Sequence, residues 1–350
     1  MKKVLSVALI LVLVIGVMAG CGSKDAKKDG GELVIYTWEG MFDDSVLKDF
    51  QKETGIKITY STFDTNETML AKLEENKGSD YDLVFGDDYI IEQVIDGGLA
   101  QKLDKDKIST LKNINPKFQG QYYDKKDEYS VPYGAGIPLI LYDKDKIGFD
   151  IDSYDDLWDG RLKDNIAITG NYRVINGITL KTLGSTLNEE NLDTIKKAGE
   201  KMQKLAPNIR VINDNNTQDF LLSEEVDVAY LYTSQATQAL KANPKLKTAF
   251  PKEGSGFGVM GGFIPKNAPN ADAAHKFLEY INQPKTAAKL FEALGYYSTN
   301  KEADKLISKD MQKLVVLPSE MKLGEMMQNV STKADDQMQK NWNKFKKATK

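Results

Sequence analysis

Between residues 33 and 95 the sequence alternates between short apolar runs and helical patterns, and this alternation limits the possible folds more than any other feature. The runs are rich in β-branched and aromatic residues, as strands are. The first helical pattern has acidic residues in its first turn, and Gly55 follows its end, as helix termini prefer. Strand–helix alternation predicts an α/β fold with a parallel sheet. The expected strands are 33–36, 56–60 and 82–85, and helices are expected from 43, over 67–75 and from 90.

The second half of the chain continues this pattern with a different sequence. Strands are predicted at 165–169 and 226–231, and helices at 192–205 and in the polar tail that follows residue 326. Two further segments, 129–142 and 257–265, mix apolar residues with Gly or Pro and are expected to be strands that cross between two lobes. Such crossings can absorb dihedral changes, so they are candidate hinges.

Two short segments that follow predicted strands are the first candidates for a binding site. They are Trp38-Glu39-Gly40 and the run from Gly86 to Tyr89, which contains Asp87. In open parallel sheets, ligands bind outside the carboxyl ends of the strands. We therefore expect these two segments to lie together at one edge of the sheet.

The start of the chain has the pattern of an export signal. Lys2 and Lys3 precede an apolar run over residues 4–18, which is followed by the small residues Ala19 and Gly20. This arrangement predicts a secretory signal peptide over residues 1–20. The run is shorter than the ~20 residues that cross a bilayer.

Residues 17–21 (VMAGC) resemble the lipobox of bacterial lipoproteins, in which the cysteine is lipidated and becomes the new N-terminus. Met18 stands where leucine is usual. The resemblance implies lipidation of Cys21. Residues 21–31 are polar and rich in Gly and Lys, which predicts a flexible tether. We expect an exported protein that is lipid-anchored to the outer face of the cytoplasmic membrane.

Composition disfavours several classes of function. The chain has 47 Lys and Arg against 51 Asp and Glu, and this mild acidity argues against a nucleic-acid partner. Cys21 is the only cysteine and His275 the only histidine. With Cys21 taken up by lipid, the mature chain has no thiolate nucleophile, and without a second His or a Cys a serine triad or a zinc site is hard to build. We expect a protein that is not an enzyme and has no cofactor and no metal site.

Two local motifs have alternative interpretations. Residues 256–261 (GFGVMG) fit the G-x-G-x-x-G pattern, but a dinucleotide site needs that pattern to open a helix, and Pro265 follows here. The adjacent tyrosine pairs at 122–123 and 296–297 could bind a ferric ion through phenolates. Aromatic packing with polar tips at the edge of a cleft is the favoured interpretation.

Six segments, in this order along the chain, resemble the spermidine/putrescine-binding proteins of polyamine ABC importers. They are 54–62 (TGIKITYST), 66–73 (NETMLAKL), 129–133 (YSVPY), 154–158 (YDDLW), 251–254 (PKEG) and 294–296 (LGY). The resemblance implies a type II periplasmic binding-protein fold, with one lobe formed by 32–135 and 262–310 and the other by 136–261 and 311–350. It also implies a monomer that delivers its ligand to an ABC permease and ATPase.

The resemblance implies ligand residues at some positions and departs from the family at others. Trp38, Tyr89 and Tyr296 match aromatic positions, and Tyr232 stands where tryptophan is usual. Asn171 and Val174 replace an acid pair, Gly258 and Met260 replace a tryptophan and an aspartate, and Met41 replaces an aromatic residue. The expected ligand-binding residues are Trp38, Glu39, Asp87, Tyr89, Asn171, Tyr232 and Tyr296.

Glu39 and Asp87 occupy positions where the family has neutral hydroxyl residues, and Asp88 is beside them. Two carboxylates can hold one ammonium by charge-assisted hydrogen bonds. We therefore expect a polyamine or another small organic cation, and loss of either acid should weaken binding at least about tenfold. The alternatives are a neutral or anionic solute, a ferric ion bound through tyrosines, a secreted enzyme on the same scaffold, or a surface sensor or adhesin.

Overall fold

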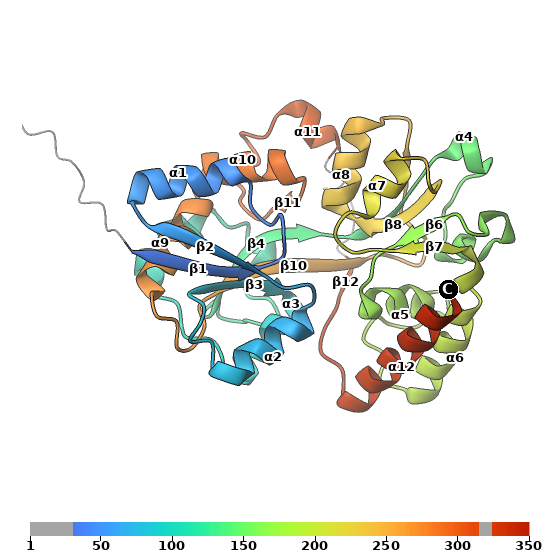
Figure 1. Cartoon of the computed structure of the whole chain (residues 1–350), viewed down its shortest axis with the longest axis horizontal. Helices are drawn as coiled ribbons and strands as arrows, with labels where there is room; N and C mark the ends of the chain where they lie inside the picture. The colour runs from blue at the N-terminus through green and yellow to red at the C-terminus, as the bar shows by residue number, and fades with distance from the viewer. Residues whose placement is uncertain (1–30, 315–323, 350) are drawn as a thin grey trace, which may run out of the picture.

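The computed structural model describes residues 31–314 and 324–349, so the predicted signal peptide, Cys21 and residues 22–30 of the predicted tether lie outside the described residues. Within the described ranges the strands form two sheets, which lie side by side with helices on both faces of each (Figure 1). No helix in this part of the chain combines the length and the hydropathy needed to cross a membrane.

The larger sheet has the strand order β11-β4-β10-β3-β1-β2, and β12 pairs with β10. The predicted parallel pairing is confirmed for β1 with β2 and β3, whereas β10 runs antiparallel to both β3 and β4. Its strands are β1 (Glu32–Thr37), β2 (Lys57–Thr62), β3 (Leu83–Asp87), β4 (Ser130–Gly136), β10 (Gly256–Phe263), β11 (Tyr297–Ser298) and β12 (Glu325–Met326).

Alternating side chains bury both faces of this sheet. Leu33 and Ile35 of β1 pack against one helical layer, while Tyr36 packs against the other. Asp43 caps the first helix by accepting a hydrogen bond from Ser45 N at 2.9 Å, and Gly55 ends it with φ 77°, as predicted. One layer contains α1 (Asp44–Thr54), α9 (Ala271–Ile281) and α10 (Pro284–Leu294), and the other contains α2 (Asn66–Asn76) and α3 (Asp88–Asp96).

The smaller sheet has the order β7-β6-β8-β5-β9, in which β6 runs parallel to β7 and β8. Its strands are β5 (Pro138–Tyr142), β6 (Ile166–Ile168), β7 (Ile209–Ile212), β8 (Val228–Tyr232) and β9 (Lys247–Ala249). Helices α7 (Thr217–Leu222) and α8 (Thr233–Ala242) cover one face, and α5 (Tyr172–Lys181), α6 (Leu192–Gln203) and α12 (Thr332–Ala348) cover the other. The remaining helices are α4 (Lys144–Ile147) and α11 (Lys309–Leu314), with 3-10 turns at Lys105–Lys107, Ser109–Asn113, Pro116–Phe118, Tyr154–Trp158, Gly160–Leu162 and Ala206–Asn208.

The chain passes between the two halves three times, between β4 and β5, between β9 and β10, and between β12 of the larger sheet and α12, which covers the smaller one. The predicted crossing at 129–142 is confirmed, because β4 belongs to the larger sheet and β5 to the smaller one. The expectation that 257–265 itself crosses is wrong, because β10 pairs with strands of the larger sheet along its length and the passage precedes Gly256. The lobe boundary expected between residues 261 and 262 therefore falls inside β10.

Candidate functional site

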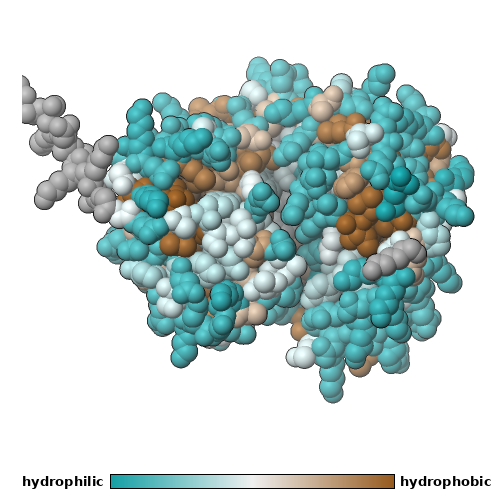
Figure 2. All heavy atoms as spheres, in the orientation of Figure 1, coloured by the Kyte–Doolittle hydropathy of each residue, from teal (hydrophilic) through white to brown (hydrophobic). Residues whose placement is uncertain are grey.

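A cleft of about 360 Å³ lies where the two sheets face each other. Figure 2 shows the mainly hydrophilic surface hollowed between the two halves of the molecule. The cleft is lined by residues that follow β1, β3, β6, β7 and β8. In both sheets it therefore lies outside the carboxyl ends of the strands, where open sheets bind their ligands. The structure brings all seven predicted ligand residues to this cleft, namely Trp38, Glu39, Asp87, Tyr89, Asn171, Tyr232 and Tyr296.

Asp87 ends β3 and is held by the first residue of α2. The amide Nδ2 of Asn66, a residue only 4% exposed, donates to Asp87 Oδ2 at 2.7 Å and to the Tyr89 hydroxyl at 3.1 Å. Burial, together with the nearby carboxylates of Asp214 and Glu67, raises the pKa of Asp87 to about 6. An ammonium ion beside Asp87 would relieve this destabilisation of its charged form.

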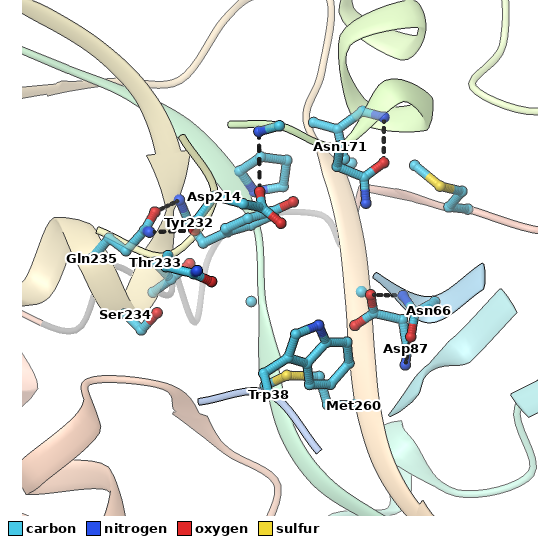
Figure 3. A pocket seen from close by; sticks show the side chains of 18 of the residues that line it. Trp38, Asn66, Asp87, Asn171, Asp214, Tyr232, Thr233, Ser234, Gln235 and Met260 are labelled. Carbon is cyan, nitrogen blue, oxygen red and sulfur yellow. Dashed lines mark hydrogen bonds between the residues drawn. The ribbon is translucent and has the colours of Figure 1, made fainter. Parts of the chain in front are cut away.

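Asp214, which sequence reasoning missed, faces Asp87 from the other lobe (Figure 3). It lies just beyond β7, where its carboxylate accepts hydrogen bonds from the Thr169 hydroxyl and from Gly170 N, the latter at 3.2 Å. Its backbone oxygen accepts from Gln235 Nε2 at 2.8 Å. Burial raises the pKa of Asp214 as well. The signal that could have found it is the apolar segment 209–212 immediately before it, which was not predicted as a strand.

Three aromatic rings are partly open to the cleft. Trp38 follows β1, and its ring lies 4.8 Å from that of Phe63, centroid to centroid. Tyr232 ends β8, and its hydroxyl is within hydrogen-bond distance of Thr169 Oγ1, at 3.1 Å. Tyr296 follows Gly295, which ends α10 with φ 75°, and burial raises the pKa of Tyr296 to about 12. These rings can pack against an organic cation, because the faces of aromatic rings attract positive charge.

Tyr89 and Asn171 line the same cleft in supporting positions. Tyr89 is only 4% exposed, and its hydroxyl donates to Glu67 Oε1 at 3.1 Å. The Arg173 guanidinium lies 5.9 Å from the centroid of its ring. Asn171 caps α5, since its Oδ1 accepts from Arg173 N at 2.9 Å and from Val174 N at 3.2 Å. These side chains fix the walls of the cleft.

The other two acids near β1 and β3 have different environments. Glu39 is exposed. Asp88 is only 1% exposed, and its carboxylate accepts from Tyr89 N at 2.8 Å and from Val259 N at 3.1 Å. Asp88 thus ties α3 to β10. Asp214 and Glu67, and not Glu39, are the acids whose charges raise the pKa of Asp87.

The cleft is strongly acidic. Among the described residues that line it there is no Lys, Arg or His. Gln218, which is 7% exposed, adds an Oε1 acceptor without a hydrogen-bond partner among the described residues. A site of this kind favours a ligand that is cationic and donates hydrogen bonds. The lining carboxylates are Glu39, Asp64, Glu67, Asp87, Asp88 and Asp214.

The remaining motifs have structural roles or lie elsewhere. The glycine-rich run at 256–261 lies within β10 and opens no helix, so it lacks the context of a dinucleotide site. His275 lies within α9, where its Nε2 accepts from Asp104 N at 2.9 Å. Tyr122 and Tyr123 pack edge to face with ring centroids 5.4 Å apart and do not line the cleft. Burial raises the pKa of both phenols, which opposes the phenolate form that a ferric ion needs.

Comparison with known proteins identifies the family. The model of the family described as bacterial extracellular solute-binding protein matches residues 45–318. The chain is a member of this family. The spermidine/putrescine-binding periplasmic protein of Salmonella typhimurium is 33% identical over 301 residues, which are 86% of each chain. The spermidine/putrescine-binding periplasmic protein 1 of Haemophilus influenzae is 33% identical over 304 residues, which are 84% of each chain.

Solved structures of similar proteins confirm the type II periplasmic binding-protein fold. A putative spermidine/putrescine ABC transporter protein from Listeria monocytogenes has a TM-score of 0.85 and 31% identity, over 90% of this solute-binding protein and 98% of that chain. The spermidine/putrescine substrate-binding protein PotD from Streptococcus pneumoniae has a TM-score of 0.78 and 30% identity, over 91% and 100%. The family consists of solute-binding transport proteins, not enzymes.

Proposed function

We propose that this solute-binding protein binds a polyamine or a related small organic cation in its cleft and delivers it to the permease and ATPase of an ABC importer. The observation that carries the proposal is the lining of the cleft, which contains acids from both lobes and, within the described residues, no basic side chain. An anionic solute would be repelled by this charge, and a neutral solute would gain hydrogen bonds from it but no charge pairing. The names of the relatives from Salmonella typhimurium and Haemophilus influenzae agree with a polyamine-like cation.

In the proposed complex an ammonium group lies between Asp87 and Asp214. Both carboxylates are partly buried and carry raised pKa values, so pairing with a cation offsets their lost hydration. The rings of Trp38, Tyr232 and Tyr296 stand beside this position, and each ring adds ~0.5–2 kcal/mol of cation–π attraction. Glu39, at the exposed rim, would act mainly by attracting the cation.

The lobes are proposed to close on the ligand by rotation about the three passages between them. One lobe contains the larger sheet and the other the smaller sheet, so the boundary lies before Gly256 and β10 belongs whole to the first lobe. A ligand that contacts both Asp87 and Asp214 binds the closed form better than the open one, and this difference in affinity drives closure. Export and lipidation at Cys21 would keep this monomer beside its permease.

Titration calorimetry with putrescine and spermidine tests the proposal, with 1,4-butanediol as the uncharged control. Binding of an amine and not of the diol is expected. Asp87→Asn and Asp214→Asn should each weaken binding at least about tenfold, the effect of losing one charged hydrogen bond. Glu39→Gln should have a smaller effect because Glu39 is exposed. Asp96→Asn, at the exposed end of α3, is the control that matches the change of charge. Equal binding of the diol and the amines would contradict the proposal.

A cysteine variant tests the anchor. Cys21→Ser should release the exported protein from the membrane fraction, whereas the unchanged protein should remain with it until detergent is added. Equal release of both proteins would contradict lipid anchoring at Cys21.

A further inference from the structure

Glu67 is an acid of the cleft that has no cation partner. It lies in the first turn of α2, lines the cleft and is partly exposed. Within the described residues its carboxylate accepts one hydrogen bond, from the Tyr89 hydroxyl to Oε1 at 3.1 Å. The buried cation Arg173 on α5 donates instead to Gln328 O, at 2.9 Å. The Glu67 carboxylate can therefore take a charged group of a ligand.

A chain of hydrogen bonds holds Glu67 at a short distance from Asp87. Asn66 Nδ2 donates to Asp87 Oδ2 at 2.7 Å and to the Tyr89 hydroxyl at 3.1 Å. The same hydroxyl donates to Glu67 Oε1. Three successive hydrogen bonds place the two carboxylate oxygens at most ~9 Å apart. Asn66 and Tyr89 are each 4% exposed, so packing fixes the two side chains that join these acids.

An aromatic ring follows the strand between the two acids. In the larger sheet β1 lies between β3 and β2, so Trp38, which follows β1, leaves the sheet between Asp87 at the end of β3 and the segment that leads from β2 to Glu67. Adjacent strands are ~4.8 Å apart, so β3 and β2 are ~10 Å apart. Figure 3 shows the Trp38 ring near Asp87 and Asn66. A ring face between two carboxylates suits an alkyl chain that carries an ammonium at each end.

The charge of the cleft also suits two cations better than one. Glu67 and Asp214 both raise the pKa of Asp87, so these acids repel one another when no cation is bound. A single ammonium between Asp87 and Asp214 leaves Glu67 unpaired. The opposite wall adds Gln218 of α7, whose buried Oε1 has no hydrogen-bond partner in the described part of the chain. These unused acceptors favour a ligand with several N–H donors.

The other end of the cleft offers no free acid for a second ammonium. The lining there includes Val174, Ile178 and Leu187, which are 8%, 1% and 5% exposed. Asp88 is almost fully buried and already accepts a hydrogen bond from Val259 N. Because an unpaired buried charge is costly, a second ammonium is better placed on the α2 side.

We propose that Glu67 forms a second cation site, so that the cleft binds two neighbouring ammonium groups of a diamine or longer polyamine at the same time. One ammonium lies between Asp87 and Asp214, and the other lies at Glu67. The methylenes between them lie on the Trp38 ring, and the exposed Asp64 lies at the rim. With bonds of ~1.5 Å, the two nitrogens of extended putrescine are ~6 Å apart. Each reaches a carboxylate oxygen over a further ~2.8 Å, so putrescine can span the two sites. The inference rests on the proposed function, since it takes the Asp87–Asp214 position as the first cation site.

The test compares putrescine with n-butylamine, which has the same carbon chain and one ammonium, by titration calorimetry on the purified full-length protein. The wild type should bind putrescine at least about tenfold tighter than butylamine, the effect of one charged hydrogen bond. Glu67→Gln keeps an acceptor for the Tyr89 hydroxyl and should lower this preference at least tenfold. Glu67→Asp, which keeps the charge, should retain more of the preference than Glu67→Gln. Glu74→Gln, on an exposed position of the same helix, is the matched control and should retain all of it.

The outcomes separate this inference from the proposed function. If putrescine and butylamine bind the wild type equally, or if Glu67→Gln keeps the wild-type preference, the inference is overturned and the first cation site stands. If Glu39→Gln removes the preference and Glu67→Gln does not, the second ammonium binds at the rim and the inference is wrong. If neither amine binds, or if 1-butanol binds as well as butylamine, the proposed function itself fails.

Discussion

Cation binding should weaken about tenfold between pH 7 and pH 5, because Asp87 takes up a proton in this range. Its pKa is raised to about 6, first by burial and then by Asp214 and Glu67. About one-tenth of the ligand-free protein then carries protonated Asp87 at pH 7, against roughly nine-tenths at pH 5. An alkylammonium stays charged throughout this range. Only the ionised carboxylate pairs with it, so the apparent affinity falls by the ratio of the two ionised fractions.

Asp214 can only increase the loss of affinity expected between pH 7 and pH 5. Asp214 also has a raised pKa, and its protonation would remove the second partner of the ammonium. The tenfold loss is therefore the lower limit of the expected change. Salt must be held constant, because screening alone weakens pairing between exposed charges.

Calorimetric titration with hexylamine or putrescine at pH 5, 6 and 7 measures the effect. The Asp87→Asn variant should bind more weakly at pH 7 and should lose most of the dependence on pH. Asp96→Asn should keep the full dependence, because that side chain is exposed at the far end of α3. The reasoning is refuted if the wild-type affinity is equal at pH 5 and pH 7, or if Asp87→Asn retains the wild-type slope.

Three further changes test the site and the fold. Trp38→Ala should weaken amine binding by roughly threefold to thirtyfold in calorimetry through the loss of one ring face, and an unchanged affinity would contradict its role. Because the folded-state pKa of Asp87 is raised, stability is lost as pH rises from about 4 through about 6. Asp87→Asn should thus raise the free energy of unfolding of the ligand-free protein by ~1–3 kcal/mol at pH 7 and by little at pH 4, measured by denaturant titration. Gly199→Ala should lower the melting temperature despite the better helix propensity of alanine, since its Cβ would lie 2.3 Å from Asn341 Oδ1; a higher melting temperature would be the contrary result.

The local elements were predictable because they depend on periodicity and on caps. The helix that begins after Asp43 and ends at Gly55 has the cap geometry that these residues favour. The strand β7 was missed because four residues, one of them charged, give too short a pattern. The antiparallel course of β10 was also not predicted, since strand direction depends on pairing with β3 and β4, which are far away in the sequence.

The candidate site was partly predictable, because some of its residues follow strands that have a clear local pattern. Trp38 and Asp87 follow strands that the sequence shows clearly, and the rule for carboxyl ends brings them together. Asp214 could not be placed opposite Asp87 without the second sheet. The hydrogen bond from Asn66 to Asp87 likewise joins the start of α2 to the end of β3, a contact that no local pattern encodes.

The sequence by itself determined the α/β class, the order of most elements, the aromatic residues near strand ends and the predicted export signal, because these follow from neighbours along the chain. Only the tertiary structure decided which acids face each other. Asp87 and Asp214 come from different lobes, and their raised pKa values arise from burial between those lobes. The lining of the cleft was decided in the same way, since the residues that follow β1, β3, β6, β7 and β8 meet only when the chain has folded. Burial and distance between remote segments are properties of packing, which no pattern of neighbours along the chain contains.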